Sequence, residues 1–427
     1  MQSWILAGYF PRINRRFSEA EFIDTIIVGS GQGGLSTSYY LKQAGHPHLI
    51  LEKAGEVAHV WRERWDSFTL ITPNWMVRLP SAEYEGDQMD GFMARHEVVA
   101  YFESYAKRFN LPVKLHTCVA SVEPTKAGYA IKTNAGEYQA DNVVVATGLY
   151  QQPKVPLFSR KLSTKITQIH SDAYKNPGSL PDGAVLVVGS SQSGAQIAEE
   201  LYQSGRKVYL SVSNAGRLPR RYRGRDFTHW MNVMGDFART VDELPDPKDK
   251  FAPSSHGTGK DGGHTINLHQ FAREGVVLLG RIQNAENDRI LLAPDLKENL
   301  ARADKFEEDF TQTVDKFIAQ HQINAPTETL PKLTAGYQQE EIDALDLSSA
   351  GIGCVIWSTG YQFDFSMVKV PTFDQNGYPI HTRGVTDYPG LFFIGLPFLY
   401  SGISGVIAGV GADAAYITSR ILSNGIE

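Results

Sequence analysis

Two glycine-rich segments carry the residue types and the spacing best suited to chemistry in this chain. The first runs Val28-Gly-Ser-Gly-Gln-Gly-Gly34 and the second runs Val188-Gly-Ser-Ser-Gln-Ser-Gly194. Each follows a β-branched, apolar run and precedes a stretch of helical composition. Glycines at such a junction let a pyrophosphate approach the free N–H groups of the helix N-terminus, where the helix dipole favours an anion. Two such motifs predict two dinucleotides that face each other, for which a flavin and a nicotinamide are the usual pair.

The first segment opens a unit that its spacing predicts to be a dinucleotide-binding βαβ fold. A helix is expected over residues 34–44, where Gly45 is a natural C-cap. The next strand ends at Glu52, about 20 residues past the glycines, which is the position that hydrogen-bonds a ribose hydroxyl. The unit closes at Thr147-Gly148, where an apolar strand stops at a glycine turn. We therefore expect the first dinucleotide at this edge of the sheet.

The second segment opens a unit that repeats the order of strand, glycine turn, helix and strand. No acid ends its second strand, over residues 207–212, whereas an NAD site normally places one there for the ribose 2′-hydroxyl. The missing acid and the arginines that follow at 217, 220 and 221 favour NADPH over NADH, because an arginine fork suits a 2′-phosphate. The same arginines also fit an ion-paired or solvated loop. The residues expected at this site are Gly189, Ser190, Gln192, Ser193, Gly194 and Arg217.

Prolines and glycine turns mark where the chain passes between the two units. Prolines between 153 and 181 mark the first crossing, and an irregular stretch over 214–263 is long enough to be functional. Thr359-Gly360 then repeats the earlier Thr147-Gly148, and a further apolar strand ends at Gly395. We expect an α/β fold of two Rossmann-like domains, with the NADPH domain inserted into the FAD domain. The expected ranges are 1–150 for the first part of the FAD domain, 151–345 for the NADPH domain with a long loop insertion, and 346–427 for the return segment of the FAD domain.

The composition excludes several classes of protein. A net charge of −6 over 427 residues argues against a general nucleic-acid binder, and no apolar run approaches membrane-spanning length. Cys118 and Cys354 form no CxxC pair, which excludes a redox-active disulfide and a cysteine zinc site. The histidines show no metal-ligand spacing with acids, so no metal is expected.

The N-terminal residues 1–10 are apolar, but no basic residue precedes them. We therefore expect a poorly ordered arm, or a strand packed on the first domain, rather than a secretion signal. The simplest location is the cytoplasm. The expected partners are a small-molecule substrate and O₂, and a homodimer is open.

The order of these motifs resembles that of the flavin-dependent monooxygenases of the two-dinucleotide class. The resemblance covers residues 24–419 and includes the YUCCA-type, flavin-containing and Baeyer–Villiger monooxygenases and a bacterial branch of FAD/NAD(P)-binding flavoproteins. His170-Ser171 looks like the second half of a family fingerprint, whose Phe and Gly are replaced here by Thr164 and Ile166. That departure speaks against a Baeyer–Villiger enzyme in particular. In relatives the fingerprint His is more a hinge than an acid or base, so a structural role is expected for His170.

The resemblance also implies roles for individual residues around FAD. Trp61 would lie against the flavin, although a tryptophan packed in the core is the alternative. Asn74 would be the catalytic residue, with its amide on the oxygenated flavin or on the nicotinamide, although an Asn beside Pro also forms Asx-turns. The residues expected to bind FAD are Gly29, Gly31, Gln32, Gly33, Gly34, Glu52, Lys53, Trp61, Arg62, Val119, Ala146, Thr147, Gly148 and Gly395. Thr359 and Gly360 are also expected to bind a cofactor.

Three functions fit these residues. The first is a monooxygenase in which NADPH reduces FAD, and the reduced FAD takes up O₂ as a C4a-(hydro)peroxide that oxygenates a small organic substrate. The second is an FAD-dependent NAD(P)H oxidoreductase that inserts no oxygen. The third is a non-catalytic flavoprotein sensor or binding subunit, although two intact dinucleotide motifs favour turnover.

Overall fold

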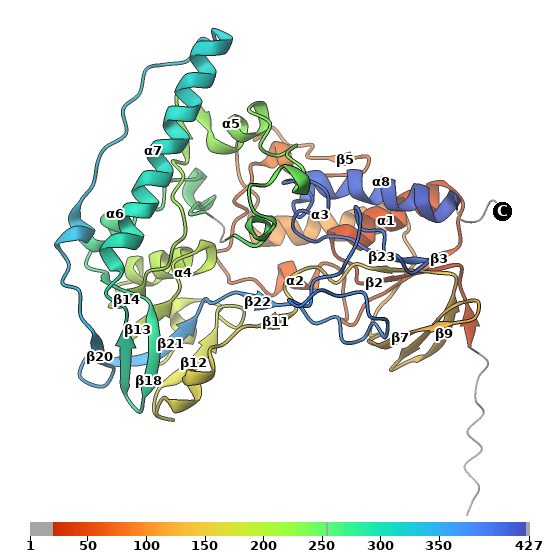
Figure 1. The fold of residues 1–427 in the computed structure, drawn as a ribbon, viewed down its shortest axis with the longest axis horizontal. Coiled ribbons are helices and arrows are strands. Elements are labelled where there is room, and N and C mark those ends of the chain that lie inside the picture. The colour runs from red at the N-terminus through yellow and green to blue at the C-terminus, as the bar shows by residue number, and fades with distance from the viewer. Residues whose placement is uncertain (1–19, 253–254, 424–427) are drawn as a thin grey trace, which may run out of the picture.

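Two parallel five-stranded sheets form the framework of the protein in its computed structural model, which describes residues 20–252 and 255–423 (Figure 1). The first sheet has the order β23-β10-β2-β3-β6, and all of its neighbouring strands run parallel. Its strands are β2 (Thr25–Val28), β3 (His48–Leu51), β6 (Val113–Lys114), β10 (Asn142–Val145) and β23 (Leu391–Phe393). The apolar runs of β2 and β10 are buried along their whole length, as strands covered on both faces must be.

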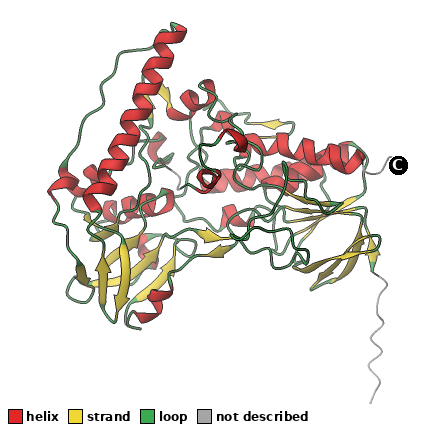
Figure 2. Cartoon of the chain, in the orientation of Figure 1, coloured by secondary structure: helices red, strands yellow, loops and turns green. Residues whose placement is uncertain are grey.

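Helices cover one face of the first sheet and a smaller sheet covers the other (Figure 2). The helices are α1 (Gln32–Gln43), α3 (Arg95–Arg108) and α8 (Ile407–Ser423), and α1 packs beside α8. The smaller sheet has the order β1-β9-β8-β7, with β1 (Glu21–Phe22), β7 (Val119–Thr125), β8 (Gly128–Thr133) and β9 (Gly136–Ala140). Between the first glycine turn and α3 lie α2 (His59–Arg62), the 3₁₀ turn η1 (Asn74–Met76), β4 (Arg78–Leu79) and β5 (Ala82–Glu83).

The second sheet repeats the arrangement of the first around the second glycine turn. Its order is β12-β21-β13-β14-β17, with β12 (Thr167–His170), β13 (Ala184–Val188), β14 (Val208–Ser211), β17 (Val277–Leu279) and β21 (Ile352–Trp357). The helices around it are α4 (Gln192–Gln203), α6 (Leu268–Arg273) and α7 (Leu296–His321). A three-stranded sheet of β18 (Ile282–Glu286), β19 (Arg289–Leu292) and β20 (Ala344–Asp346) lies at its end.

The chain crosses between the units twice, and the two crossings pair with each other. β11 (Gln152–Pro153) and β22 (Tyr361–Gln362) are antiparallel. The α/β class with the second unit inserted into the first is therefore confirmed. The expected boundary between 345 and 346 is too early, because it falls inside β20, and because β21 lies between β12 and β13 in the second sheet. The expected N-terminal arm falls on residues that the structure does not describe.

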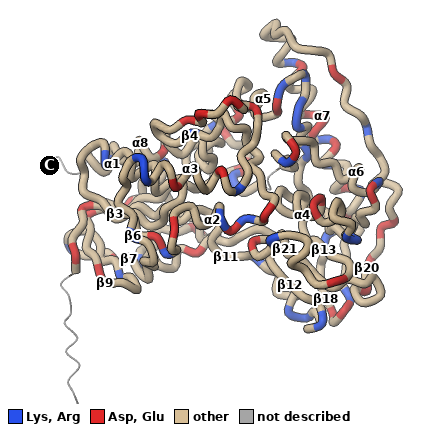
Figure 3. Tube along the Cα trace, turned by 180° about the vertical axis from the view of Figure 1, so that it is seen from behind, with Lys and Arg blue, Asp and Glu red and all other residues tan. Residues whose placement is uncertain are grey.

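Short elements occupy the expected irregular stretch over 214–263. They are β15 (Arg221–Tyr222), β16 (Arg225–Asp226), α5 (Phe227–Val233), η4 (Val241–Glu243), η5 (Pro247–Phe251) and η6 (Lys260–Gly262). The remaining 3₁₀ turns are η2 (Leu157–Lys161), η3 (Pro177–Ser179) and η7 (Ala335–Gln338). α7 runs past α5 and away from both sheets (Figure 1). Acidic and basic segments are interspersed over both units (Figure 3).

Candidate functional site

The first glycine turn is shaped by three glycines that do different work. Gly29 has a φ of +105°, and a Cβ there would lie 2.8 Å from the Ala146 carbonyl oxygen. A Cβ on Gly34 would lie 1.9 Å from the Gly29 carbonyl oxygen, so only glycine lets α1 leave the turn this closely. At Gly31, the N-cap of α1, a Cβ would meet no atom of the described chain within 4 Å. The turn therefore leaves room beside the N-terminus of α1, which is where a pyrophosphate binds.

Glu52 is tied to this turn. Its side chain is 8% exposed and accepts hydrogen bonds from the Ser30 backbone N–H at 2.8 Å, from the Ser30 hydroxyl at 2.7 Å and from the Ala54 N–H at 2.9 Å. These bonds hold the carboxylate at the end of β3, beside the space left at Gly31, as a ribose ligand requires. Ser30 was missed from the sequence, although Ser190 repeats it at the same place in the second motif.

The segment that leads to Val119 runs alongside the end of β3. The Thr117 N–H donates to the Glu52 carbonyl at 2.8 Å, and the His116 N–H donates to the Ala54 carbonyl at 2.9 Å. Val119 is half-buried at the start of β7, two residues after Thr117, and its contact with a cofactor stays a prediction. Lys53 is exposed.

Three parallel strands end together at this edge of the first sheet. The Ala146 N–H donates to the Val28 carbonyl at 2.9 Å, and the Ile394 N–H donates to the Val145 carbonyl at 3.0 Å. Thr147, Gly148 and Gly395 therefore lie beside the glycine turn, at the carboxyl ends of the strands where α/β sheets bind ligands. Gln151 was missed from the sequence: its Nε2 donates to the Thr147 hydroxyl at 2.9 Å and to the Gly148 carbonyl at 2.7 Å.

Gln32 and Gly33 close the turn from above. The Nε2 of Gln32 donates to the Gly405 carbonyl at 2.9 Å, just before α8 begins. A Cβ on Gly33 would lie 3.0 Å from the Ile394 side chain. One space thus lies between the first turn, Glu52 and the ends of β10 and β23. The residues around this space suit the pyrophosphate and ribose of a dinucleotide such as FAD.

Trp61 and Arg62 lie on α2 and are engaged by protein partners. The Trp61 ring is half-buried and stacks on Phe102, with centroids 6.2 Å apart and an angle of 20° between the planes. Arg62 is paired with Glu56 at 2.9 Å and with Glu103. These contacts favour the packing alternative for Trp61, and they leave the flavin contacts of both residues as predictions.

Asn74 is buried, and half of its amide is unused. The residue is 4% exposed, and its Nδ2 donates to the Gln88 carbonyl at 2.9 Å. Its Oδ1 is buried without a hydrogen-bond partner among the described residues. The Asx-turn alternative is therefore wrong, because such a turn needs Oδ1 to accept a backbone N–H. The same segment reaches the start of α8, where the Arg78 Nε donates to the Ala408 carbonyl at 3.4 Å.

The second glycine turn repeats the packing of the first. Gly189 has a φ of +99°, and a Cβ there would lie 2.6 Å from the Ser358 carbonyl oxygen. A Cβ on Gly194 would lie 1.8 Å from the Gly189 carbonyl oxygen. The Ser190 hydroxyl accepts the Ser213 N–H at 2.9 Å. Ser190, Gln192 and Ser193 therefore lie at the N-terminus of α4 (Gln192–Gln203), as expected for a dinucleotide turn.

The strand register places Val212 where the first unit has Glu52. Val28 pairs with Leu51 in the first sheet, and Val188 pairs with Ser211 in the second, so the next residues correspond. Val212 is 1% exposed and carries no acid for a ribose 2′-hydroxyl. The strand pairing therefore agrees with the expectation from the sequence that this strand lacks the acid of an NAD site.

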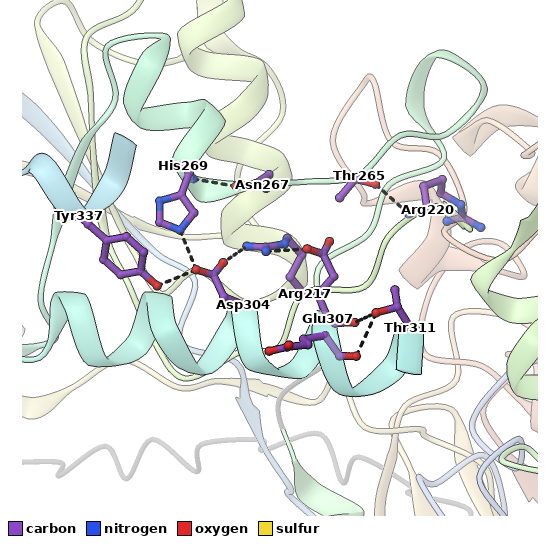
Figure 4. Close-up of polar contacts among 10 residues, drawn as sticks. Arg217, Arg220, Thr265, Asn267, His269, Asp304, Glu307, Thr311 and Tyr337 are labelled. Carbon is purple, nitrogen blue, oxygen red and sulfur yellow. Dashed lines mark hydrogen bonds and ion pairs between the residues drawn. The ribbon is translucent and has the colours of Figure 1, made fainter. Parts of the chain in front are cut away.

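Arg217 is turned toward α7 and does not present a free guanidinium (Figure 4). It is 5% exposed and forms ion pairs of 2.7 Å with Asp304 and with Glu307. A 2′-phosphate at Arg217 would have to compete with two carboxylates, so these contacts give no support to the expected role. The other two arginines are also occupied, because Arg220 pairs with Asp226 at 2.6 Å and Arg221 donates to the carbonyls of Gly262 and Gly263.

Asp304 is the centre of this network, with the buried Arg217 and His269 on one half-buried carboxylate. The Tyr337 hydroxyl donates to its Oδ2 at 2.6 Å, and the His269 Nε2 lies 3.2 Å from the same oxygen. The Gly336 N–H donates to the His269 Nδ1 at 3.0 Å, so the ring proton is on Nε2 and points to Asp304. Burial alone would raise the pKa of Asp304, but the bonds from His269 and Tyr337 and the charge of Arg217 lower that pKa to about 2.

Thr359 and Gly360 hold the crossing between the units. The Thr359 hydroxyl donates to the Lys154 carbonyl, and the Lys154 N–H donates to the Gly360 carbonyl at 2.9 Å. His170 is 6% exposed, and its Nε2 lies 2.9 Å from the Gly360 carbonyl oxygen. Its Nδ1 lies 3.0 Å from the Asp172 carboxylate. These contacts suit the structural role expected for His170 at the junction.

Within residues 20–252 and 255–423, no group of three or more His, Cys, Asp and Glu side chains is placed to hold a metal ion. In the same part of the chain, no helix combines the length and the apolar character needed to cross a membrane.

Comparisons with known proteins agree with this geometry. A profile of the pyridine nucleotide-disulphide oxidoreductase family matches residues 26–230. The CzcO-like oxidoreductase of Geobacillus kaustophilus is 34% identical over 404 residues, which cover 94% of this chain and 99% of the relative. The indole-3-pyruvate monooxygenase YUCCA6 of Arabidopsis thaliana is 30% identical over 209 residues, about half of each protein (47% of this chain and 50% of the relative).

The fold also matches that of a solved flavoprotein. The flavin-containing monooxygenase from Stenotrophomonas maltophilia superposes with a TM-score of 0.65 at 18% identity, over 95% of this chain and 99% of that one. The resemblance to the flavin-dependent monooxygenases is thus confirmed at the level of class, and the protein is an oxidoreductase. Given the extent of the match to the Geobacillus relative, the chain belongs to the CzcO-like family of oxidoreductases.

Proposed function

We propose that the protein is an FAD-dependent monooxygenase that uses NADPH and O₂ to oxygenate a small organic substrate. The observation that carries the proposal is the buried Asn74, whose Oδ1 has no partner in the described chain. A buried amide oxygen without a protein partner is costly unless a ligand or an ordered water binds it. Asn74 belongs to a segment that contacts the start of α8, and α8 begins beside the first glycine turn through Gln32.

The proposed division of labour follows the two glycine turns. The N-terminus of α1 and Glu52 would hold the pyrophosphate and ribose of FAD, and the N-terminus of α4 would hold the nicotinamide dinucleotide. When bound, FAD supplies the redox chemistry and the reaction with O₂. Asn74 would orient the reacting groups by hydrogen bonding and, being buried, would help to exclude water. No protein nucleophile is needed for this reaction.

The preference for NADPH rests on Val212, because an apolar residue at the position of Glu52 offers no carboxylate to a ribose 2′-hydroxyl. Comparing kcat/KM for NADPH and NADH tests it. We expect kcat/KM for NADPH to exceed that for NADH, because Val212 gives the ribose of NADH no carboxylate to bind and, unlike a carboxylate, does not repel a 2′-phosphate. Equal values would remove the preference and leave the rest of the proposal intact.

The alternative is an NAD(P)H oxidoreductase that inserts no oxygen. A disulfide substrate would need a thiol pair, whereas Cys118 is exposed in the first unit and Cys354 is buried in β21 of the second. Rapid mixing of the NADPH-reduced enzyme with O₂, followed by analysis of amine, sulfide and ketone substrates for added oxygen, decides between the two. Reduction of an acceptor with no oxygenated product from any substrate would contradict the monooxygenase.

A homodimer and a cytoplasmic location stay predictions.

A further inference from the structure

The helix after each glycine turn begins with a glutamine that holds a distant segment. Gln32 is the first residue of α1, and Gln192 is the first residue of α4. The Nε2 of Gln32 donates to the Gly405 carbonyl, and the Nε2 of Gln192 donates to the Gly257 carbonyl. The two glutamines therefore occupy equivalent positions in the two units, and each donates a hydrogen bond to a segment that has no counterpart in the other unit.

The first unit shows what this contact does at a dinucleotide turn. Gly405 lies two residues before the start of α8, which packs beside α1. Gln32 therefore fixes the N-terminus of α8 as the second wall of the space beside Gly31. In the second unit no long helix reaches this position in the described chain, and residues 256–258 occupy it.

Residues 256–258 are attached to the second turn by more than one bond. Gln196, one helical turn after Gln192, also donates from its Nε2 to the Gly257 carbonyl, at 3.1 Å. His256 is 1% exposed, and its Nε2 donates to the Ser190 carbonyl because a carbonyl only accepts. Burial lowers the pKa of His256 to about 4, so the ring is neutral near pH 7 and keeps this arrangement.

The other side of the same segment faces the first unit. A Cβ on Gly257 would lie 2.8 Å from the Ile71 side chain, and a Cβ on Gly259 would lie 2.0 Å from the Leu70 carbonyl oxygen. Ile71 lies three residues before Asn74 in the chain. Residues 256–259 therefore extend from the second glycine turn to the segment that carries Asn74, and a nicotinamide dinucleotide on that turn would pass along them if Asn74 faces the flavin.

We propose that Gln192 and His256 are positioning residues that hold residues 256–258 as the closing wall of the nicotinamide dinucleotide site, as Gln32 holds the start of α8 for the other site. This inference rests on the proposed function, because it assumes that the second turn binds NAD(P)H. Neither residue touches the reacting atoms, so their removal should weaken binding of the dinucleotide more than it slows hydride transfer.

The test uses the FAD-loaded, oxidised protein and NADP⁺ as a redox-inert probe. The variant is Gln192→Ala, and the matched control is Gln43→Ala, an exposed glutamine at the end of α1. Titration followed by flavin absorbance should give a Kd for NADP⁺ raised roughly two- to tenfold in Gln192→Ala, the effect of one hydrogen bond, and unchanged in Gln43→Ala. NADP⁺ should slow amide hydrogen exchange at residues 256–258 in the parent protein and should slow it less in Gln192→Ala.

Two further readouts separate a closing wall from a merely structural role. The rate of flavin reduction at saturating NADPH should change less than the Kd does. Gln196→Ala removes only the longer bond to Gly257, so it should give a smaller rise in the Kd and keeps the test available if Gln192→Ala does not fold. The inference would be overturned if the amide hydrogens of residues 256–258 exchanged faster in both variants than in the parent protein while the Kd for NADP⁺ stayed unchanged. That result would leave the proposed function intact. A parent protein that binds neither NADP⁺ nor NAD⁺ would overturn the assignment of the second site and the inference with it.

Discussion

At the scale of single residues, the first glycine turn separates a binding role from a packing role within one motif. Gly34 is required by the fold, because a Cβ there would collide with a backbone carbonyl at 1.9 Å. Gly31 is not required by the fold, because its φ of −76° is open to any residue and a Cβ would meet nothing within 4 Å in the described chain. Within the described chain, a Cβ at Gly31 therefore costs no backbone strain and no close contact, and what it takes up is space for a ligand.

Replacing Gly31 by Val should give a folded protein that lacks FAD. The bound flavin is measured from its absorbance per polypeptide, and folding from the circular dichroism and the thermal unfolding. Gly34→Ala is the matched control and should fail to accumulate as folded protein, because its clash is with backbone. A yellow Gly31→Val protein would contradict the assignment of the first turn to a pyrophosphate.

Asn74→Ala should leave FAD binding and flavin reduction nearly intact and damage the step after reduction. Removing one preorganised hydrogen bond of this kind costs about 10²–10³ in the step that it serves. NADPH oxidation should then end in H₂O₂ rather than in oxygenated product, which is measured as H₂O₂ released per NADPH with and without substrate. Asn232→Ala, an exposed asparagine on α5, should behave as the parent protein does. A well-folded Asn74→Ala protein with unchanged coupling would remove Asn74 from the mechanism.

At the scale of elements, α7 is fixed to the second sheet through charge. Asp304 and Glu307 of α7 both pair with Arg217, which follows β14, while Tyr337 of η7 and His269 of α6 bind Asp304 (Figure 4). Three segments distant in the chain therefore bind one carboxylate of α7. Removing one partner of such an ion pair is strongly destabilising when the remaining charge is buried, as the Arg217 side chain is at 7% exposed.

Asp304→Asn should lower the free energy of unfolding by about 2 kcal/mol near neutral pH, since its hydrogen bonds involve charged groups. The pKa of about 2 in the folded protein lies below the unfolded value of about 3.9. The stabilisation is therefore complete above about pH 4 and is lost as the pH falls toward 2. Urea unfolding between pH 3 and 7 should show the gap between the parent and the variant narrowing at the acidic end.

Asp309→Asn on the same helix is the control, because Asp309 is 57% exposed and pairs only with Lys305 in the i, i+4 arrangement. Its effect should stay below about 0.5 kcal/mol at every pH. A gap between parent and Asp304→Asn that stays constant down to pH 3 would contradict the role given to the Asp304 charge.

At the scale of the whole molecule, the two units share a side chain. Trp65 follows α2 in the first unit, yet it is 5% exposed within the hydrophobic core of the second unit, with Tyr174 and Leu180. Beside it, the Asp66 N–H donates to the Lys175 carbonyl at 2.8 Å. The relative position of the two dinucleotide turns therefore depends in part on this tryptophan.

Trp65→Ala should destabilise the protein by about 3–5 kcal/mol, as for other large-to-small changes in a core. It should also slow flavin reduction at saturating NADPH, because a small misplacement of the two cofactors has a large effect on the rate. Trp65→Phe should recover most of the stability. Both are measured by denaturant unfolding and by single-turnover reduction, and a loss below about 1 kcal/mol would show that Trp65 is not a core residue.

Features that depend on local spacing could be predicted from the sequence. Strand–turn–helix geometry is set by neighbours in the chain. It predicts the two glycine turns, Glu52 at the end of β3, the missing acid at Val212 and the insertion of one unit into the other. The helix expected over 34–44 was predicted within two residues, since α1 runs from Gln32 to Gln43. Other features are visible only in the folded chain: β21 joins the second sheet, Arg217 pairs with α7, Asn74 keeps a buried oxygen without a partner in the described chain, and residues 256–258 lie on Gln192. Each of these depends on contacts between segments far apart in the sequence, and the geometry of such contacts is set by how whole elements pack rather than by any local pattern.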